Sequence, residues 1–294
     1  MNPVKIGLLA VIVVAGLVLA FVWAVAAREV EARRRRAGTG GGFAIGLVTN
    51  FLDTLGIGSF APTTAALKLF RLAPDELIPG TLNVGLAIGS ILESLIFITT
   101  VEVAARLLVA MIVAAAVGAW FGAGVVMRLP RRAIQIGMGV ALLIAGSVFA
   151  AVNLKLLPGG GEALDLVGWQ FPLAVGASLV LGALMTIGIG MYAPTMIMLA
   201  LLGVHPLAAF PIMMGACALL MPVAGVRFVR SGWLAWGPAL GLSLGACIGV
   251  PVAAFIVKSL PLAQLRWLVV AVVLYAAFAM LRSAVAAVSR EPSA

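Results

Sequence analysis

A ten-residue motif occurs twice in the chain and holds the groups best suited to bind an anion. The first copy is Thr54-Leu55-Gly56-Ile57-Gly58-Ser59-Phe60-Ala61-Pro62-Thr63, and seven of its ten residues recur between Thr186 and Thr195. Glycine accepts unusual backbone angles and proline favours the first turn of a helix. Each motif therefore predicts a break and then a new helix, which begins near Ser59 to Pro62 or near Met191 to Pro194. Helix N-termini carry about half a positive charge, so two together would form an anion site.

Polar side chains near the breaks complete this predicted anion site. The alternative for Thr63 and Thr195 is a hydrogen bond back to a carbonyl of their own helix. With the motif glycines, the candidate substrate-binding residues are Asn50, Thr54, Gly56, Gly58, Ser59, Thr63, Asn83, Thr186, Gly188, Gly190, Tyr192 and Thr195.

Asp53 and Glu93 are candidates for proton coupling. They are the acidic residues furthest from any predicted loop, and carboxyl groups inside a membrane are costly enough to indicate function. Asp53 directly precedes the first motif, whereas Met185 holds that position in the second. This asymmetry favours a single coupling site, where protonation would remove a charge that repels an anionic substrate. For Glu93, a buried hydrogen bond to a neighbouring helix is the alternative.

The composition predicts that helices crossing a membrane position these residues. The 294 residues are 64% hydrophobic and 10% charged, with a mean hydropathy of +1.22. Several uncharged runs reach the roughly 20 residues needed to cross a bilayer. We therefore expect an all-α polytopic protein of the cell inner (plasma) membrane. The net charge of +9 lies mostly in short loops, which indicates membrane topology and not a nucleic-acid partner.

The first apolar run, residues 6 to 27, is followed by the block Arg33 to Arg36. A signal peptide is the alternative, but the run is longer than the usual core and the arginines resist translocation. We interpret it as a retained helix with its N-terminus outside. A flexible glycine link is expected at 38–42.

Further helices are expected at 80–100, 103–127 and 133–152, and again at 206–227, 232–257 and 264–285. A motif segment precedes each set, at 43–70 and at 171–203. The predicted units are an N-terminal anchor with a basic cytoplasmic linker (1–42), a first repeat (43–152), an external linker (153–170) and a second repeat (171–294).

The distribution of basic residues decides how the motif segments cross the membrane. If each crosses once, eleven basic residues lie inside and eight outside, and the outside set includes Arg128, Arg131 and Arg132 in one short loop. If each is a helix-break-helix hairpin, fourteen lie inside and five outside, which agrees better with the positive-inside rule. Each half then has a hairpin plus three spans, so the halves form an inverted repeat with a cytoplasmic C-terminus.

Few residues are available for catalysis or metal binding. Cys217 and Cys247 lie inside apolar runs and are expected to be buried, and His205 is expected in a turn. The chain has no HExxH and no GxSxG motif. We therefore expect no metal, no cofactor and no enzymatic activity. Glycines 118 and 122 and glycines 241, 245 and 249 are expected to permit close helix packing.

Two segments of the chain resemble the sulfite exporter TauE/SafE family of membrane permeases. The first runs from Gly46 to Gly85 and includes Gly56-Ile57-Gly58, Pro62 and Pro79-Gly80-Thr81, and the second is its copy at Gly182 to Gly215. The resemblance covers about residues 43 to 285, and the first span has the character of an addition. It implies a secondary transporter of small sulfur-containing anions, such as sulfite, sulfoacetate or related organosulfonates, with export the expected direction. Ser59 and Met191 stand where the family motif often has a third glycine.

The sequence thus predicts a proton-coupled transporter whose partners are a small sulfur-containing anion, protons and the lipid bilayer. An anion channel, or a permease for another small carboxylate or oxyanion, is the alternative. Formation of a homo-oligomer stays open.

Overall fold

The computed structural model describes residues 2–32, 36–156 and 161–256, with six further residues between 274 and 285. Most of the expected span at 264–285 lies outside these residues, as do the C-terminal end, Arg33 to Arg35 and most of the glycine-rich part of the 153–170 linker. The described chain is helical, without a β-strand, and has one isolated bridge between Ala163 and Val204. Its helices are α1 (Pro3–Ala26), α3 (Thr39–Thr54), α4 (Phe60–Leu69), η1 (Asp75–Leu77), α5 (Ile78–Gly85), α6 (Ala87–Thr100), α7 (Ala105–Val126), α8 (Arg131–Asn153), α9 (Gln170–Met185), α10 (Tyr192–Leu201), α11 (Pro206–Ser231) and α12 (Trp236–Ile256).

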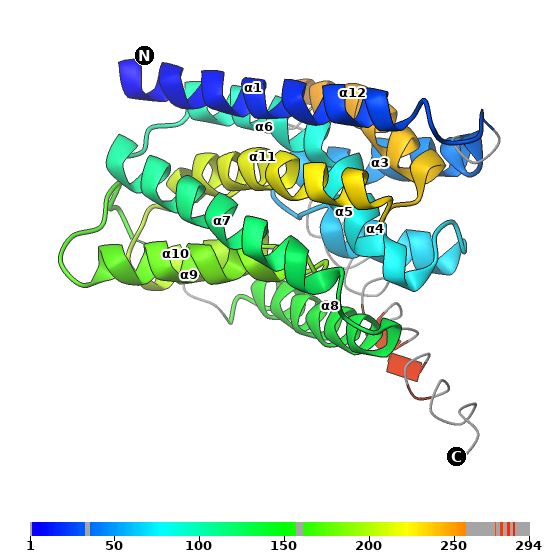
Figure 1. Ribbon diagram of the computed structural model, residues 1–294. Coiled ribbons are helices and arrows are strands. Elements are labelled where there is room, and N and C mark those ends of the chain that lie inside the picture. The colour runs from blue at the N-terminus through cyan, green and yellow to red at the C-terminus, as the bar shows by residue number, and fades with distance from the viewer. Residues whose placement is uncertain are drawn as a thin grey trace.

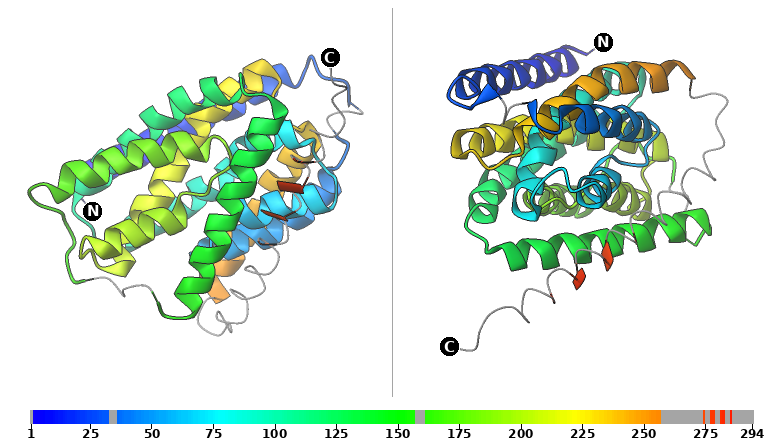
Figure 2. Two further views of the ribbon diagram at one scale, coloured as in Figure 1. Left: turned by 90° about the horizontal axis from the view of Figure 1, so that it is seen from below. Right: turned by 90° about the vertical axis from the view of Figure 1, so that its right-hand side faces the viewer.

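Five helical stretches in the described chain are long and apolar enough to cross a membrane, as expected for a multi-pass membrane protein. They are Pro3–Ala26, Asp75–Thr100, Ala105–Val126, Leu207–Ser231 and Trp236–Phe255. Most of the helices run along one common direction, and α1 and α8 form the outer layers on opposite sides of the bundle (Figures 1 and 2).

The first motif segment folds back on itself. The break lies between α3 and α4, where Gly56 and Gly58 have φ of +79° and +91°. On either side of it, the hydroxyl of Thr63 donates a hydrogen bond of 2.9 Å to that of Thr49. A Cβ added to Gly41 would lie 2.8 Å from the side chain of Leu72. The chain after α4 therefore returns to the level at which α3 begins.

The second motif segment has the same form. Its break lies between α9 and α10, and Gly188 has φ of +105°. The side-chain amide of Gln170, the first residue of α9, donates a 3.4 Å hydrogen bond to the carbonyl of Leu202, which follows α10. In Figure 1 the α3–α4 hairpin enters the bundle from the right and the α9–α10 hairpin from the left.

Both hairpins begin their second arms where the motifs predicted, at Phe60 and at Tyr192. The expectation of a flexible link at 38–42 was wrong, because α3 begins at Thr39. A Cβ on Gly42 would meet the backbone of Pro238 at 2.5 Å, so contact with α12 outweighs the low helix propensity of the glycines. The expected helix at 80–100 is also divided, between α5 and α6 at Leu86.

Glycines permit two close helix pairs that cross between the halves of the chain. α3 packs on α12, and α9 packs on α7. Cβ atoms on Gly241, Gly245 and Gly249 would overlap the backbone of α3, and those on Gly118 and Gly122 would overlap that of α9. The predicted packing role of these glycines is confirmed. α9 begins 131 residues after α3, and α12 begins 131 residues after α7, close to the offset between the two motif copies.

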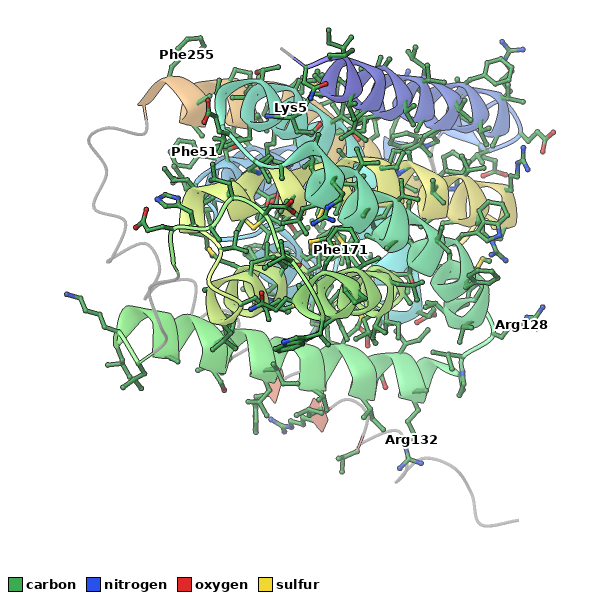
Figure 3. All side chains as sticks on the ribbon, turned by 90° about the vertical axis from the view of Figure 1, so that its left-hand side faces the viewer. Lys5, Phe51, Arg128, Arg132, Phe171 and Phe255 are labelled. Carbon is green, nitrogen blue, oxygen red and sulfur yellow. The ribbon has the colours of Figure 1, made fainter. Side chains whose placement is uncertain are left out.

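The outer faces of the bundle carry large apolar side chains. Phe255 is 88% exposed and Phe21 is 70% exposed, and Phe255 points away from the protein in Figure 3. Such a surface suits contact with lipid acyl chains.

Candidate functional site

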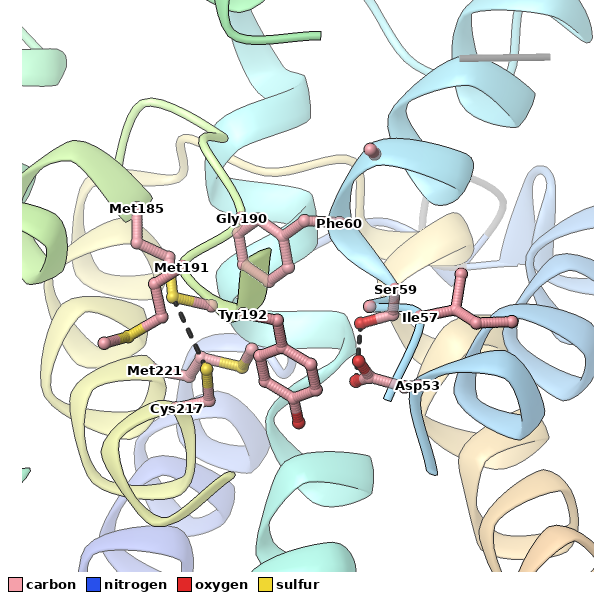
Figure 4. Close-up of a pocket in the computed structure, with 12 residues that line it drawn as sticks. Asp53, Ile57, Ser59, Phe60, Met185, Gly190, Met191, Tyr192, Cys217 and Met221 are labelled. Carbon is pink, nitrogen blue, oxygen red and sulfur yellow. Dashed lines mark hydrogen bonds between the residues drawn. The ribbon is translucent and has the colours of Figure 1, made fainter. Parts of the chain in front are cut away.

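The two motif breaks meet at one buried cavity (Figure 4). It is lined from the first half by Asp53 and residues 57–61, and from the second half by Met185, Gly190, Met191 and Tyr192, with Cys217 and Met221 of α11. The cavity has a volume of about 30 Å³, enough for about two water molecules. It is therefore too small to hold a substrate anion together with its water shell in this conformation.

The aromatic residue of each motif packs on the second glycine of the other. A Cβ on Gly58 would lie 3.7 Å from Cβ of Tyr192, and a Cβ on Gly190 would lie 3.2 Å from Cβ of Phe60. Because these residues occupy equivalent motif positions, the two contacts are nearly reciprocal. Contacts of this kind are typical of two segments related by an approximate two-fold axis. A Cβ at Gly190 would press on Phe60, whereas at Gly58 the positive φ disfavours a side chain.

Two helix N-termini contribute to the cavity. Phe60 and Ala61 start α4, Tyr192 starts α10, and no side chain of the N-cap residues Ser59 and Met191 caps either helix. The first N–H groups of a helix have no partner within the helix. Together with the partial positive charge of the helix ends, they can hold an anion.

Asp53, near the C-terminal end of α3, lies beside the start of α4. The Ser59 hydroxyl donates a 2.7 Å hydrogen bond to Oδ2 of Asp53, and the Ser59 backbone also donates to this carboxyl group. Asp53 is only 1% exposed, and its Oδ1 atom has no hydrogen-bond partner among the described residues. The carboxyl group thus faces the cavity with one oxygen fixed by Ser59 and one oxygen free.

Glu93 lies behind the cavity on α6 and is fully buried. Its Oε1 accepts a 2.9 Å hydrogen bond from Thr54, and its Oε2 accepts a 2.9 Å bond from the Tyr192 hydroxyl. The carboxyl groups of Glu93 and Asp53 are close enough to interact electrostatically. From the sequence, a buried hydrogen bond to a neighbouring helix was the alternative to proton coupling by Glu93. The two bonds that Glu93 makes are of this kind.

The structure brings together only some of the predicted binding residues. Gly58, Ser59, Gly190 and Tyr192 line the cavity beside Asp53, whereas Thr54 lies behind it and bonds to Glu93. The Asn50 and Asn83 side chains donate to carbonyls of their own helices. The Thr63 and Thr195 hydroxyls do not bond to carbonyls of their own helices. The Thr63 hydroxyl bonds to Thr49, and the Thr195 hydroxyl has no partner among the described residues.

The remaining candidates support the hairpins from outside the cavity. The Thr186 hydroxyl bonds to the carbonyl of Ala183. Gly56 lies against the ring of Phe210, and Gly188 against Met138 and Leu82.

Four sulfur-containing residues of the cavity were not predicted from the sequence: Met185, Met191, Cys217 and Met221. Cys217 lies 3.7 Å from the sulfur of Met185, and the ring of Tyr192 separates Cys217 and Met221 from Asp53 in Figure 4. Met191 is a motif residue and could have been proposed on that ground. Cys217 and Met221 lie in the apolar stretch of α11 between Pro211 and Pro222, outside any repeated motif.

The other predictions for cysteine and histidine have mixed outcomes. Cys217 is buried as expected, whereas Cys247 is exposed, because it lies on the outward side of α12. His205 precedes α11 as expected for a turn residue, and its Nδ1 caps that helix by accepting from the backbone N–H of Leu207 at 3.2 Å.

The comparison with protein families gives one match. The family model described as "Sulfite exporter TauE/SafE" matches residues 2–149, which is half of the chain. The match includes α1, so the interpretation of the first span as an addition to the family fold was wrong. No match to the chain was found among curated proteins or solved structures. The chain, a multi-pass helical membrane protein with paired helix breaks at a buried cavity, belongs to the sulfite exporter TauE/SafE family of membrane permeases.

Proposed function

We propose that this protein is a proton-coupled secondary transporter of small sulfur-containing anions, such as sulfite, sulfoacetate or related organosulfonates, and that it works in export. The observation that carries the proposal is the meeting of the N-termini of α4 and α10 at one cavity beside Asp53. The family supports the class of substrate. Coupling to protons rests on the position of Asp53.

In this mechanism Asp53 competes with the substrate. An ionised Asp53 carboxylate takes the donors at the start of α4 through Ser59. An anion in the cavity needs the same positive helix end and is repelled by the carboxylate. Protonation of Asp53 removes the charge, so that proton and anion occupy the site together. Glu93 has both oxygens bonded, and therefore we assign it a positioning role and Asp53 the coupling role.

We further propose that residues 43–152 and 171–294 are inverted repeats, with 1–42 an anchor and basic linker and 153–170 an external linker. The exchanged pairs α3–α12 and α7–α9 and the opposed hairpins support this assignment. Rocking of one repeat against the other would expose the cavity to either side in turn. The small volume of the cavity favours such a transporter over an open channel.

The experiment uses the full chain in proteoliposomes with labelled sulfite or sulfoacetate. Under an imposed pH gradient we expect saturable flux and counterflow. Asp53→Asn should abolish pH-driven flux and retain exchange of substrate. Asp165→Asn is the matched control, because Asp165 lies in an exposed loop and pairs with Arg106 at 3.2 Å.

Three results would change the proposal. Full pH-driven transport by Asp53→Asn would remove the coupling role of that residue. Absence of flux for every sulfur oxyanion tested, with flux of a small carboxylate, would replace the substrate class. Flux that never saturates and shows no counterflow would favour the channel.

A further inference from the structure

A second and larger cavity lies on the outer face of the bundle, between α1 and α12. Both helices pack on α6 but make no extended contact with each other. The groove between them has a volume of about 430 Å³, which is within the range of pockets that hold small ligands. Ile88 of α6 contributes to its lining.

The lining changes in character along the groove. Ala20, Leu240, Leu244 and Cys247 give most of it an apolar lining, with Ser243 beside them. Trp23, Trp236 and Arg36 line the other part, near the end of α1 and the start of α12. The groove therefore combines an apolar channel with two tryptophans and one cation.

Arg36 is available to a ligand. Its residue is exposed, and it takes part in no ion pair within the described chain. It also ends a run of four arginines in the sequence, Arg33 to Arg36. Basic residues next to a membrane helix attract anionic lipids, and tryptophans commonly lie at the level of the headgroups.

We infer that this groove binds one anionic phospholipid, with an acyl chain lying between α1 and α12 toward Cys247 and the headgroup phosphate at Arg36. A zwitterionic lipid matches the apolar part but gains less from the cation. A second copy of the chain would cover the exposed outer face of α12, including Leu240 and Leu244, but it supplies no acyl chain to fill the groove. An anionic phospholipid matches both parts of the lining, because its acyl chain suits the apolar part and its phosphate suits Arg36.

The test measures quenching of tryptophan fluorescence by brominated phospholipids in the purified full chain. Brominated phosphatidylglycerol should quench at a lower mole fraction than brominated phosphatidylcholine. Replacement of both Trp23 and Trp236 by phenylalanine should remove this difference, although four other tryptophans remain. Arg36→Gln should weaken the preference for the anionic lipid about fivefold.

Arg28→Gln is the matched control, because Arg28 is an exposed arginine near the same helix end but does not line the groove. Equal loss of preference in Arg28→Gln and Arg36→Gln would overturn the inference in favour of general attraction to the basic surface. Equal quenching by both lipids would also overturn it. In a Cys217→Ala background, a Cys247–Cys247 crosslink in high yield would identify a second copy as the occupant instead.

Discussion

The Tyr192 hydroxyl donates a 2.9 Å hydrogen bond to Oε2 of Glu93 and so joins the second hairpin to a helix of the first half. Both residues are buried. Tyr192→Phe leaves the ring in place but removes the donor, and the loss of a hydrogen bond to a charged or buried acceptor costs about 1.5–3 kcal/mol. We expect this decrease in the free energy of unfolding, measured by denaturant titration in micelles, and slower transport.

A double-mutant cycle isolates this bond. In a Glu93→Gln background, Tyr192→Phe should cost clearly less than in the native chain, since the pair then contributes less. Equal costs in both backgrounds would mean that the hydroxyl acts through some other contact. Thr54→Val provides a comparison, because it removes the other donor to Glu93.

Two glycines of α9 should respond oppositely to alanine. A Cβ on Gly182 would overlap the backbone of Ala115 in α7, whereas a Cβ on Gly176 would have no neighbour within 4 Å. Gly182→Ala should therefore lower the free energy of unfolding by about 1–3 kcal/mol through overpacking. Gly176→Ala should leave stability unchanged or raise it by up to about 1 kcal/mol, because alanine favours the helix. Thermal unfolding of both variants measures the difference. Similar midpoints would show that α7 and α9 are not packed this closely.

The motif breaks could be predicted from sequence because their chemistry is local. Glycines at positive φ and a proline in the first turn of the next helix are sufficient to place the starts of α4 and α10. The neighbours of the breaks depend on packing between distant segments. Cys217 and Met221 therefore escaped prediction, and the bond from the Asn83 amide to the carbonyl of Pro79 could not be foreseen. The glycines at the start of α3 led to the wrong prediction of a flexible link for the same reason, since contact with α12 decides their conformation.

The hairpins also predict which loops share one side of the membrane. Arg71 follows α4 and Arg128 follows α7, while Lys155 follows α8, and all three residues are exposed. In a chain without Cys217 and Cys247, Lys155→Cys should react with a membrane-impermeant thiol reagent on intact cells. Arg71→Cys and Arg128→Cys should react only after permeabilisation, which would place the basic end in the cytoplasm. Labelling of Arg71→Cys and Arg128→Cys on intact cells, with Lys155→Cys protected until permeabilisation, would contradict the hairpin and favour a single crossing.

Lys68 and Asp75 form an ion pair where the first hairpin ends. The Lys68 ammonium donates to Oδ1 of Asp75 at 2.6 Å, and the Gln135 amide of α8 donates to Oδ2 at 2.7 Å. The two charged side chains are only 19% and 5% exposed, so that removal of one charge leaves the other in a poorly solvated place. Lys68→Met should lower the free energy of unfolding by about 3 kcal/mol. Arg71→Met is the control, since Arg71 is exposed and surface changes cost about 0.5 kcal/mol or less. Hydrogen exchange should also increase at the start of α8 in Lys68→Met, because the Asp75 carboxylate joins the hairpin to that helix. If both variants unfold alike and α8 exchanges as in the native chain, the pair does not hold the hairpin against α8.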